Sequence, residues 1–235
     1  MLSNEDKIYM ENIPYMNMVG ALQYAADCTC LDISFVTGMF AQFLTNPGIK
    51  HYNAVKHCFK YLKAMKNKWL VLGGINQTKL TGFADSDRMV QEGNRAISGY
   101  AFFLGNSLIS WSSKRQTLVA TSTYEAELIA LAQATQEVIA LTHLSEEILQ
   151  IANEPAMLYC DNQAVIKIVT DEELKYSERT KHLDLRRNFV RCYIEHGYIN
   201  VKYIETNDQQ ADILTKSLHV SQVKHLTRLL NLVDV

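Results

Sequence analysis

The chain changes character near Trp69, and the order of its segments from there on limits the fold more than any other feature. Four short runs rich in β-branched and aromatic residues come first: KWLVLGG, KLTGFAD, SGYAFFLG and SLISWSS. A long helical segment then runs to about Gln150, followed by the strand AMLYC, helices at 162–169 and 179–196, the strand YINVKYI and two terminal helices. Meandering strands followed by helix-linked strands predict an α/β domain, with a mixed sheet and helices on its faces.

Residues 14 to about 66 have a different pattern, in which apolar residues recur at helical spacing. Three helices are expected there, and Asn46-Pro47-Gly48 separates the second from the third. We therefore divide the chain into a helical region (1–70), an α/β domain (71–218) and a C-terminal helical tail (219–235). With 235 residues, 48% of them hydrophobic, the chain has enough apolar material for a core.

Charge and cysteine usage exclude several classes of protein. A net charge of −2 is not that of a strongly basic protein, although residues 50–68 contain six lysines and no acid. The five cysteines are scattered and odd in number, which indicates reduced core residues of an intracellular protein. No signal peptide is visible, and no apolar run approaches the roughly 18 residues of a membrane span, so we expect neither secretion nor a membrane partner.

Glu127 lies in the middle of an apolar helical stripe. Stepping 100° per residue places Tyr124, Leu131 and Val138 within about 60° of it, and Glu125 about 160° away. Only one of the two glutamates is therefore expected to face the core. Because burial of an unpaired carboxylate costs several kcal/mol, Glu127 should have a counter-charge, such as a metal ion, or should be protonated.

Three further acids stand where the chain could bring them to Glu127. Asp85 ends a strand, Asp161 ends another strand, and Asp212 lies in the first turns of a late helix. In an open α/β sheet, strand ends and the helix over them form one crevice, so the four acids can share a site. Such oxygen ligands suit Mg²⁺ or Mn²⁺, and two such ions activate a water and stabilise the leaving oxygen in phosphodiester hydrolysis.

Each of the three aspartates also has an ordinary structural explanation. Asp85 could be a turn residue, with Asp87 as the functional acid instead. Asp161 could cap the helix that follows it, and Asp212 could simply favour a helix N-terminus. Glu127 is the acid that is hardest to explain without a function.

Several segments resemble a known family. FADSD, ISGYAFFLGNSLISWSSKRQ, STYEAELIAL, LYCDNQAV, TKHLDLRRNFVR and ADILTK resemble, in this order, the ribonuclease H domain of Ty1/copia-type retrotransposon polyproteins. Upstream, IPYMNMVGALQYAADCTCLDISF and FLTNPGIKHYNAVKHCFKYLKAMKNKWLVL resemble the thumb-like and connecting end of the reverse transcriptase. The resemblance implies a ribonuclease H-like mixed five-stranded sheet flanked by helices, preceded by a small helical region.

The resemblance also implies a function. It makes Asp85, Glu127, Asp161 and Asp212 the catalytic, metal-binding acids, holding two Mg²⁺ ions for which Mn²⁺ can substitute. It implies endonucleolytic cleavage of the RNA strand of an RNA–DNA hybrid, within the larger reverse transcriptase and Pol polyprotein. The expected location is the cytoplasm, in a virus-like particle, or the nucleus.

Two other functions stay open. The chain could be a non-catalytic nucleic-acid-binding remnant of a degenerate or truncated polyprotein. An integrase-like enzyme of the same fold is less favoured, because the glutamate comes second among the acids and not last. No Tyr-x-Asp-Asp polymerase signature occurs, so we expect no polymerase active site in this chain.

A row of lysines is the first candidate for substrate binding. Lys56, Lys60 and Lys63 share one helical face by their spacing, and a solvated surface is the ordinary explanation for such a row. The run lacks interleaved acids and resembles a region that contacts template and primer, which favours contacts to phosphates.

Other candidates lie nearer the acids. Ser86, Asn162 and Gln163 could contact the hybrid, or could be ordinary cap and turn residues. His182 lies on the inward side of the helix at 179–196, and is either a core histidine or a group that approaches the scissile phosphate. The family resemblance implies a mobile histidine near the last acid, as many ribonucleases H have, but residues 205–212 contain none. Proton transfer or product release is therefore expected to use another group.

Overall fold

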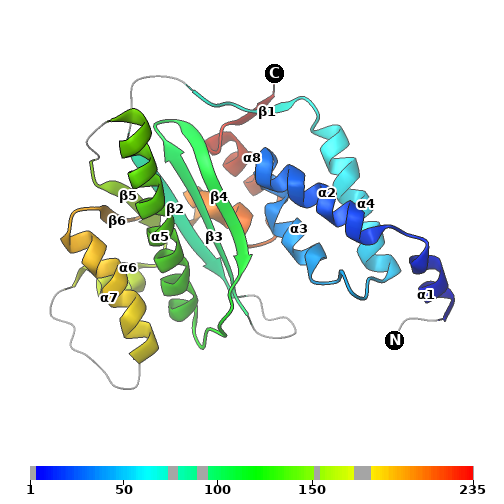
Figure 1. Cartoon of the computed structure of the whole chain (residues 1–235), viewed down its shortest axis with the longest axis horizontal. Coiled ribbons are helices and arrows are strands. Elements are labelled where there is room, and N and C mark those ends of the chain that lie inside the picture. The colour runs from blue at the N-terminus through cyan, green and yellow to red at the C-terminus, as the bar shows by residue number, and fades with distance from the viewer. Residues whose placement is uncertain (1–3, 74–78, 89–94, 151–153, 172–180, 235) are drawn as a thin grey trace. The chain divides into compact units, whose positions relative to one another are not determined.

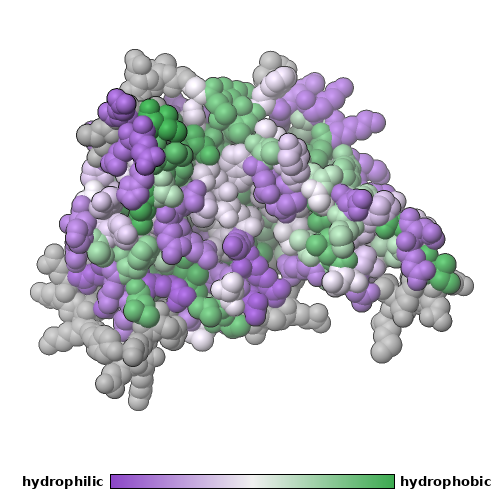
Figure 2. Space-filling view, viewed as in Figure 1, coloured by the Kyte–Doolittle hydropathy of each residue, from purple (hydrophilic) through white to green (hydrophobic). Residues whose placement is uncertain are grey.

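The structure is a computed structural model that describes residues 4–73, 79–88, 95–150, 154–171 and 181–234. It divides into two compact units. The helical unit comprises Met1–Leu70 and Leu232–Val235, and the sheet unit comprises Val71–Asn231. Figure 2 shows, on the viewed face of each unit, hydrophobic patches among hydrophilic residues.

The helical unit is built mainly from four α-helices and a short 3-10 turn. These are α1 (Asn4–Glu11), α2 (Tyr15–Cys28), η1 (Leu31–Ile33), α3 (Ser34–Ala41) and α4 (Ile49–Ala64). Leu22 of α2, Ile33 of η1 and Val55 of α4 are buried in one apolar cluster. The three helices predicted between residues 14 and 66 are therefore confirmed as α2, α3 and α4.

A two-stranded antiparallel sheet completes the helical unit. β1 (Lys68–Leu70) pairs with β7 (Leu232–Asp234), and Trp69 lies opposite Val233. The prediction of a purely helical C-terminal tail is wrong for this last segment. Helix α8 (Val220–Leu229) ends before Asn231, whose left-handed backbone (φ 57°) turns the chain out of the helix.

A mixed five-stranded sheet forms the centre of the sheet unit (Figure 1). The strand order is β4-β3-β2-β5-β6. β3 (Ile97–Leu104) pairs antiparallel with both β2 (Leu80–Asp87) and β4 (Ser107–Arg115). β5 (Ala156–Cys160) runs parallel to β2, and β6 (Ile199–Tyr203) runs parallel to β5. The predicted mixed sheet flanked by helices is confirmed.

Three helices share one apolar core with the sheet. They are α5 (Thr123–Leu149), α6 (Gln163–Thr170) and α7 (Lys181–Glu195), and Figure 1 shows α5 lying across β2 and β3. Phe102 of β3, Leu131 of α5 and Leu158 of β5 are fully buried in this core. Helix α7 ends before Gly197 (φ 74°), as expected for a glycine that closes a helix.

The 3-10 helix η4 (Gln210–Leu214) packs closely on β3. A Cβ atom added to Gly99 would lie 2.7 Å from Cγ2 of Thr215 and 2.9 Å from Cβ of Leu214. Only glycine therefore allows this approach. The side chain of Gln209 donates a hydrogen bond to the carbonyl of Ala84 (3.0 Å), which ties the start of η4 to β2.

Candidate active site

The four predicted acids come from four separate elements. Asp85 lies in β2 opposite Gly99, and Asp161 directly follows β5. Because β2 and β5 are parallel, their carboxyl ends meet at one edge of the sheet. Glu127 reaches this edge from the second turn of α5, and Asp212 reaches it from η4.

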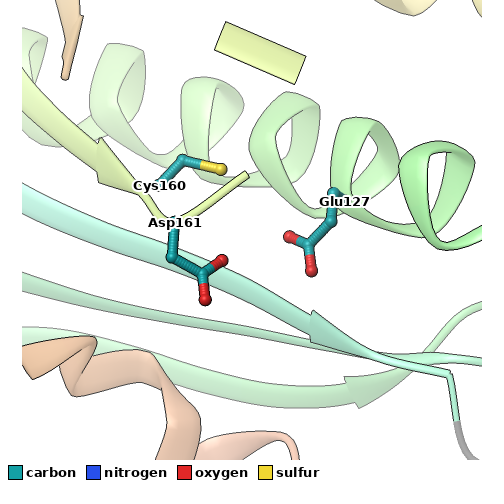
Figure 3. Close-up of side chains that lie close together, drawn as sticks. All are labelled: Glu127, Cys160 and Asp161. Atoms are coloured by element: carbon teal, nitrogen blue, oxygen red, sulfur yellow. The ribbon is translucent and has the colours of Figure 1, made fainter. Parts of the chain in front are cut away.

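Glu127 and Asp161 face each other beside Cys160. One carboxylate oxygen of each acid and the thiol sulfur of Cys160 lie within 4.8 Å of one another. Figure 3 shows both carboxylates in the same space between α5 and the end of β5. Asp161 is the more accessible of the two acids, and it accepts a hydrogen bond from Oγ1 of Thr206 (2.9 Å).

Glu127 is buried without full compensation. Its Oε2 atom has no hydrogen-bond partner among the described residues. Burial, and then the charges of Asp85 and Asp161, raise the pKa of Glu127 to about 9, and Ser86 beside it offsets only part of this rise. Without a cation nearby, the folded protein therefore favours the protonated acid at neutral pH.

Asp85 and Asp212 have polar partners of their own. The Nζ atom of Lys216 lies 2.8 Å from Oδ1 of Asp212 and 3.9 Å from Oδ2 of Asp85. Oγ1 of Thr215 donates a hydrogen bond to the same Asp85 oxygen. Lys216 and Thr215 thus hold the two acids together.

Burial still destabilises the ionised carboxylates of Asp85 and Asp212. Burial and then the charge of Asp85 raise the pKa of Asp212 to about 7, although Lys216 opposes the rise. The pKa of Asp85 is also raised by burial, against the effects of Lys216 and Thr215. The charge of Asp85 thus acts on both Glu127 and Asp212, which links the two pairs of acids.

The structure decides among the simpler explanations for the aspartates. Asn162 caps α6, because its side chain accepts a hydrogen bond from the backbone N–H of Val165 (3.1 Å), so capping does not explain Asp161. Asp85 lies within a strand and not in a turn. Asp87 ends the same strand and is only partly buried.

The prediction that only one glutamate of α5 faces the core is wrong. Glu125 is only 2% exposed, and its carboxylate accepts hydrogen bonds from the backbone N–H (2.6 Å) and Oγ1 (2.7 Å) of Thr121. A second apolar cluster, which includes Ala120 and Ala126, covers this side of the helix. A helical wheel with one buried face does not represent a helix that is covered on two sides.

The substrate-binding candidates fall into separate groups. Ser86 lies next to Glu127, while Asn162 and Gln163 follow Asp161 at the start of α6, where Gln163 is exposed. His182 lies in α7, but its side chain is outside the described part of the structure.

The lysine row belongs to the helical unit. Lys56, Lys60 and Lys63 are all exposed along α4, as expected for a row on one helical face. The ammonium of Lys56 lies 4.5 Å from the ring centroid of Tyr52.

Reasoning from the sequence did not select three polar neighbours of the acids: Thr206, Thr215 and Lys216. Lys216 could have been found, because a lysine four residues after Asp212 lies on the same side of a helical turn. Thr206 is 45 residues from its partner Asp161, and no local pattern indicates that contact.

The residues present fit a divalent cation. Oxygens of Glu127 and Asp161 lie within 4.8 Å of each other, the charge of Asp85 acts on both Glu127 and Asp212, and a buried oxygen of Glu127 has no hydrogen-bond partner in the described structure. A cation near Glu127 would favour its ionised form, against the burial and the neighbouring negative charges that raise its pKa. Carboxylate oxygens are the ligands that Mg²⁺ and Mn²⁺ prefer.

Comparison with known proteins gives the family. No protein-family model matches the chain. The chain is 38% identical over 213 residues to the retrovirus-related Pol polyprotein from transposon TNT 1-94 of Nicotiana tabacum, and 30% identical over 223 residues to that from transposon RE2 of Arabidopsis thaliana. These matches cover 90% and 94% of the chain. The chain belongs to the retrovirus-related Pol polyproteins of transposons.

The chain corresponds to part of such a polyprotein, since it covers only 16% and 15% of the two relatives. The foamy viral protease-reverse transcriptase, solved in complex with an RNA/DNA hybrid, is similar in structure, with a TM-score of 0.50. The similarity covers 93% of this chain and 28% of the viral one, and at 15% sequence identity it concerns the fold alone. The predicted family is confirmed. In the described part of the chain, no helix has the length and apolar character needed to cross a membrane.

Proposed function

We propose that the chain is a metal-dependent ribonuclease H that cleaves the RNA strand of RNA–DNA hybrids, within a retrotransposon reverse transcriptase. The observation that carries this proposal is the placement of Asp85, Glu127, Asp161 and Asp212 toward one edge of the sheet, with a buried Glu127 oxygen that has no hydrogen-bond partner among the described residues. The ribonuclease H-like sheet and the homology to transposon Pol polyproteins support it.

The four acids would hold two Mg²⁺ ions, or Mn²⁺ in their place. When bound, such ions supply an activated water and stabilise the charge that develops on the leaving oxygen. Glu127 provides a buried carboxylate whose ionisation depends on a neighbouring cation. Asp161, the more open acid of the facing pair, accepts a hydrogen bond from Thr206 and would be the acid nearer to a bound hybrid.

The remaining residues position the acids and the substrate. Thr215 and Lys216 keep Asp85 and Asp212 together. Ser86, Asn162 and Gln163 lie near the acids and would contact sugar and phosphate groups, with 2′-hydroxyl contacts distinguishing RNA from DNA. His182 is proposed to approach the scissile phosphate from α7.

The helical region would add a sequence-independent contact. Lys56, Lys60 and Lys63 are exposed on α4 and would bind phosphates of the hybrid, an interaction that weakens as salt increases. We assign residues 1–70 as the thumb-like end of the reverse transcriptase and 71–218 as the ribonuclease H domain. The rest of the Pol polyprotein is the proposed protein partner, in a cytoplasmic virus-like particle or in the nucleus.

The direct test is hydrolysis of a hybrid with one labelled strand. With Mg²⁺, the purified chain should cut a labelled RNA strand in the hybrid and leave duplex DNA intact, and Asp161→Asn should abolish the cut. Asp208→Asn, at an exposed aspartate, is the matched control and should keep the activity. Salt-sensitive binding without cleavage, beside an active control enzyme, would instead indicate a non-catalytic remnant.

A further inference from the structure

Among the described residues, a positively charged side chain, Lys216, lies on only one side of the acid cluster. Lys216 lies 2.8 Å from Asp212 and 3.9 Å from Asp85, whereas Glu127 and Asp161 form no ion pair among the described residues. In the described part of the chain, no other basic side chain forms an ion pair with the four acids. Lys216 therefore neutralises one half of the cluster.

The ammonium and a divalent ion would compete for the same two carboxylates, Asp85 and Asp212. Oδ1 of Asp212 is at ion-pair distance from Lys216, and Mg²⁺ takes carboxylate oxygens at about 2.0–2.1 Å. Two cations sharing that oxygen would repel each other strongly at such short separation. The lysine side chain is 28% exposed and has a flexible four-carbon stem, so it has a route out of the site.

We infer that Lys216 is a built-in cation that competes with one divalent ion for the Asp85–Asp212 half of the cluster, and that binding of this ion displaces the ammonium. The inference rests on the proposed metal site. It adds that Lys216 lowers the affinity of this half for the divalent ion. The displaced ammonium then becomes available to an anionic group such as a substrate phosphate. Lys216 is thus a positioning residue in the metal-free protein.

A purely structural role for Lys216 predicts the opposite change in metal affinity. If Lys216 served only to hold Asp85 and Asp212 in place for the metal, then its removal would weaken metal binding. If it competes with the metal, its removal strengthens metal binding. The sign of the change in affinity therefore distinguishes the two roles.

Titration calorimetry with Ca²⁺ measures this sign without any cleavage step. Lys216→Met should bind Ca²⁺ about tenfold more tightly than the unmodified chain, while Lys216→Arg, which keeps the charge, should bind with nearly unchanged affinity. Lys224→Met removes an exposed lysine of α8 and should change nothing. Equal or weaker binding by Lys216→Met would overturn the competition.

Two further results separate this inference from the proposed function. If neither the unmodified chain nor Lys216→Met binds Ca²⁺, Mg²⁺ or Mn²⁺, the metal site itself is wrong and the competition fails with it. If Lys216→Met does not fold, NMR of the lysine ammonium groups in the unmodified chain provides the test. The Lys216 signal should shift as Ca²⁺ saturates the site while the Lys224 signal stays constant, and an unchanged Lys216 signal at saturation would contradict the displacement.

Discussion

The two halves of the acid cluster differ in how their charge is compensated. Asp85 and Asp212 are held by Thr215 and Lys216. Glu127 has a buried oxygen without a hydrogen-bond partner among the described residues, and Asp161 is held by the hydroxyl of Thr206. One half therefore contains a lysine ammonium, whereas in the other half Glu127 favours a proton unless an external cation is near.

This difference shows how a fold can tolerate four acids in one site. An unpaired buried charge is costly, so a cluster without any cation would favour protonation or local opening. A lysine that neutralises one half reduces that cost. The uncompensated half then retains its affinity for an added cation, and this is the property that the proposed reaction needs.

The largest expected effect is a loss of hybrid cleavage when Glu127, in the half without a lysine, is changed. Glu127→Gln should reduce hybrid cleavage by about three orders of magnitude, or roughly 4 kcal/mol of barrier, because it removes a proposed metal ligand. The rate of RNA cleavage in Mg²⁺ measures the effect. Glu146→Gln, at an exposed glutamate of the same helix, should cut normally. Near-normal cleavage by Glu127→Gln would exclude this acid from the reaction.

The next effect is a dependence of metal-free stability on pH. Glu127 has a pKa of about 9 in the folded protein against an ordinary value of 4.5, so the folded protein holds a proton that the unfolded chain loses in between. Stability should therefore fall as pH rises from about 5 to 9, by on the order of a few kcal/mol.

Urea unfolding in EDTA across this pH range measures that slope. Glu127→Gln should flatten most of it, and Glu146→Gln should preserve it. If the slope is the same in Glu127→Gln and in the unmodified chain, the burial of Glu127 does not cause the pH dependence of stability.

A smaller effect, on stability, is expected where η4 packs on β3, because this contact positions Asp212 beside Asp85. Gly99→Ala would place a Cβ atom 2.7 Å from Thr215 and 2.9 Å from Leu214, so η4 must shift. Overpacking of this kind should cost about 1–3 kcal/mol of unfolding free energy. Gly20→Ala, in a helix with open space around the added atom, should be neutral or slightly stabilising. Equal stability of the two variants would contradict the close packing.

The smallest effect should come from the hydrogen bond to Asp161. Thr206→Val removes the hydroxyl that donates to the carboxylate, at a position partly open to water, and should cost about 0.5–1.5 kcal/mol at most. Thermal unfolding and hybrid cleavage should both change only modestly. A loss of cleavage comparable to that of Glu127→Gln would assign Thr206 a much larger role than the structure indicates.

Much of the site could be predicted because local patterns determined it. The apolar stripe around Glu127 identified a buried acid, and the strand endings at Asp85 and Asp161 placed two more acids at one edge of the sheet. The role of Asp212 was implied by the family resemblance, since its own sequence context is that of an ordinary helix start.

The missed features depend on contacts between distant segments. Glu125 is buried because a second cluster covers the far side of α5, which a single-helix pattern does not reveal. β7 exists through pairing with β1 (Lys68–Leu70), which is distant in the sequence, and the short segment Leu232–Asp234 has no strand pattern of its own. The hydroxyl of Thr206 donates to Asp161 across 45 residues of sequence, so no local pattern indicates the contact.

The most direct test of the proposed metal site is a crystal of the chain soaked in Mn²⁺ and examined by anomalous diffraction. Mn²⁺ should appear among the carboxylates of Asp85, Glu127, Asp161 and Asp212, with Lys216 moved away from Asp212. Mn²⁺ that is bound elsewhere, with these four carboxylates making no contact to a cation at saturating concentration, would contradict the assignment.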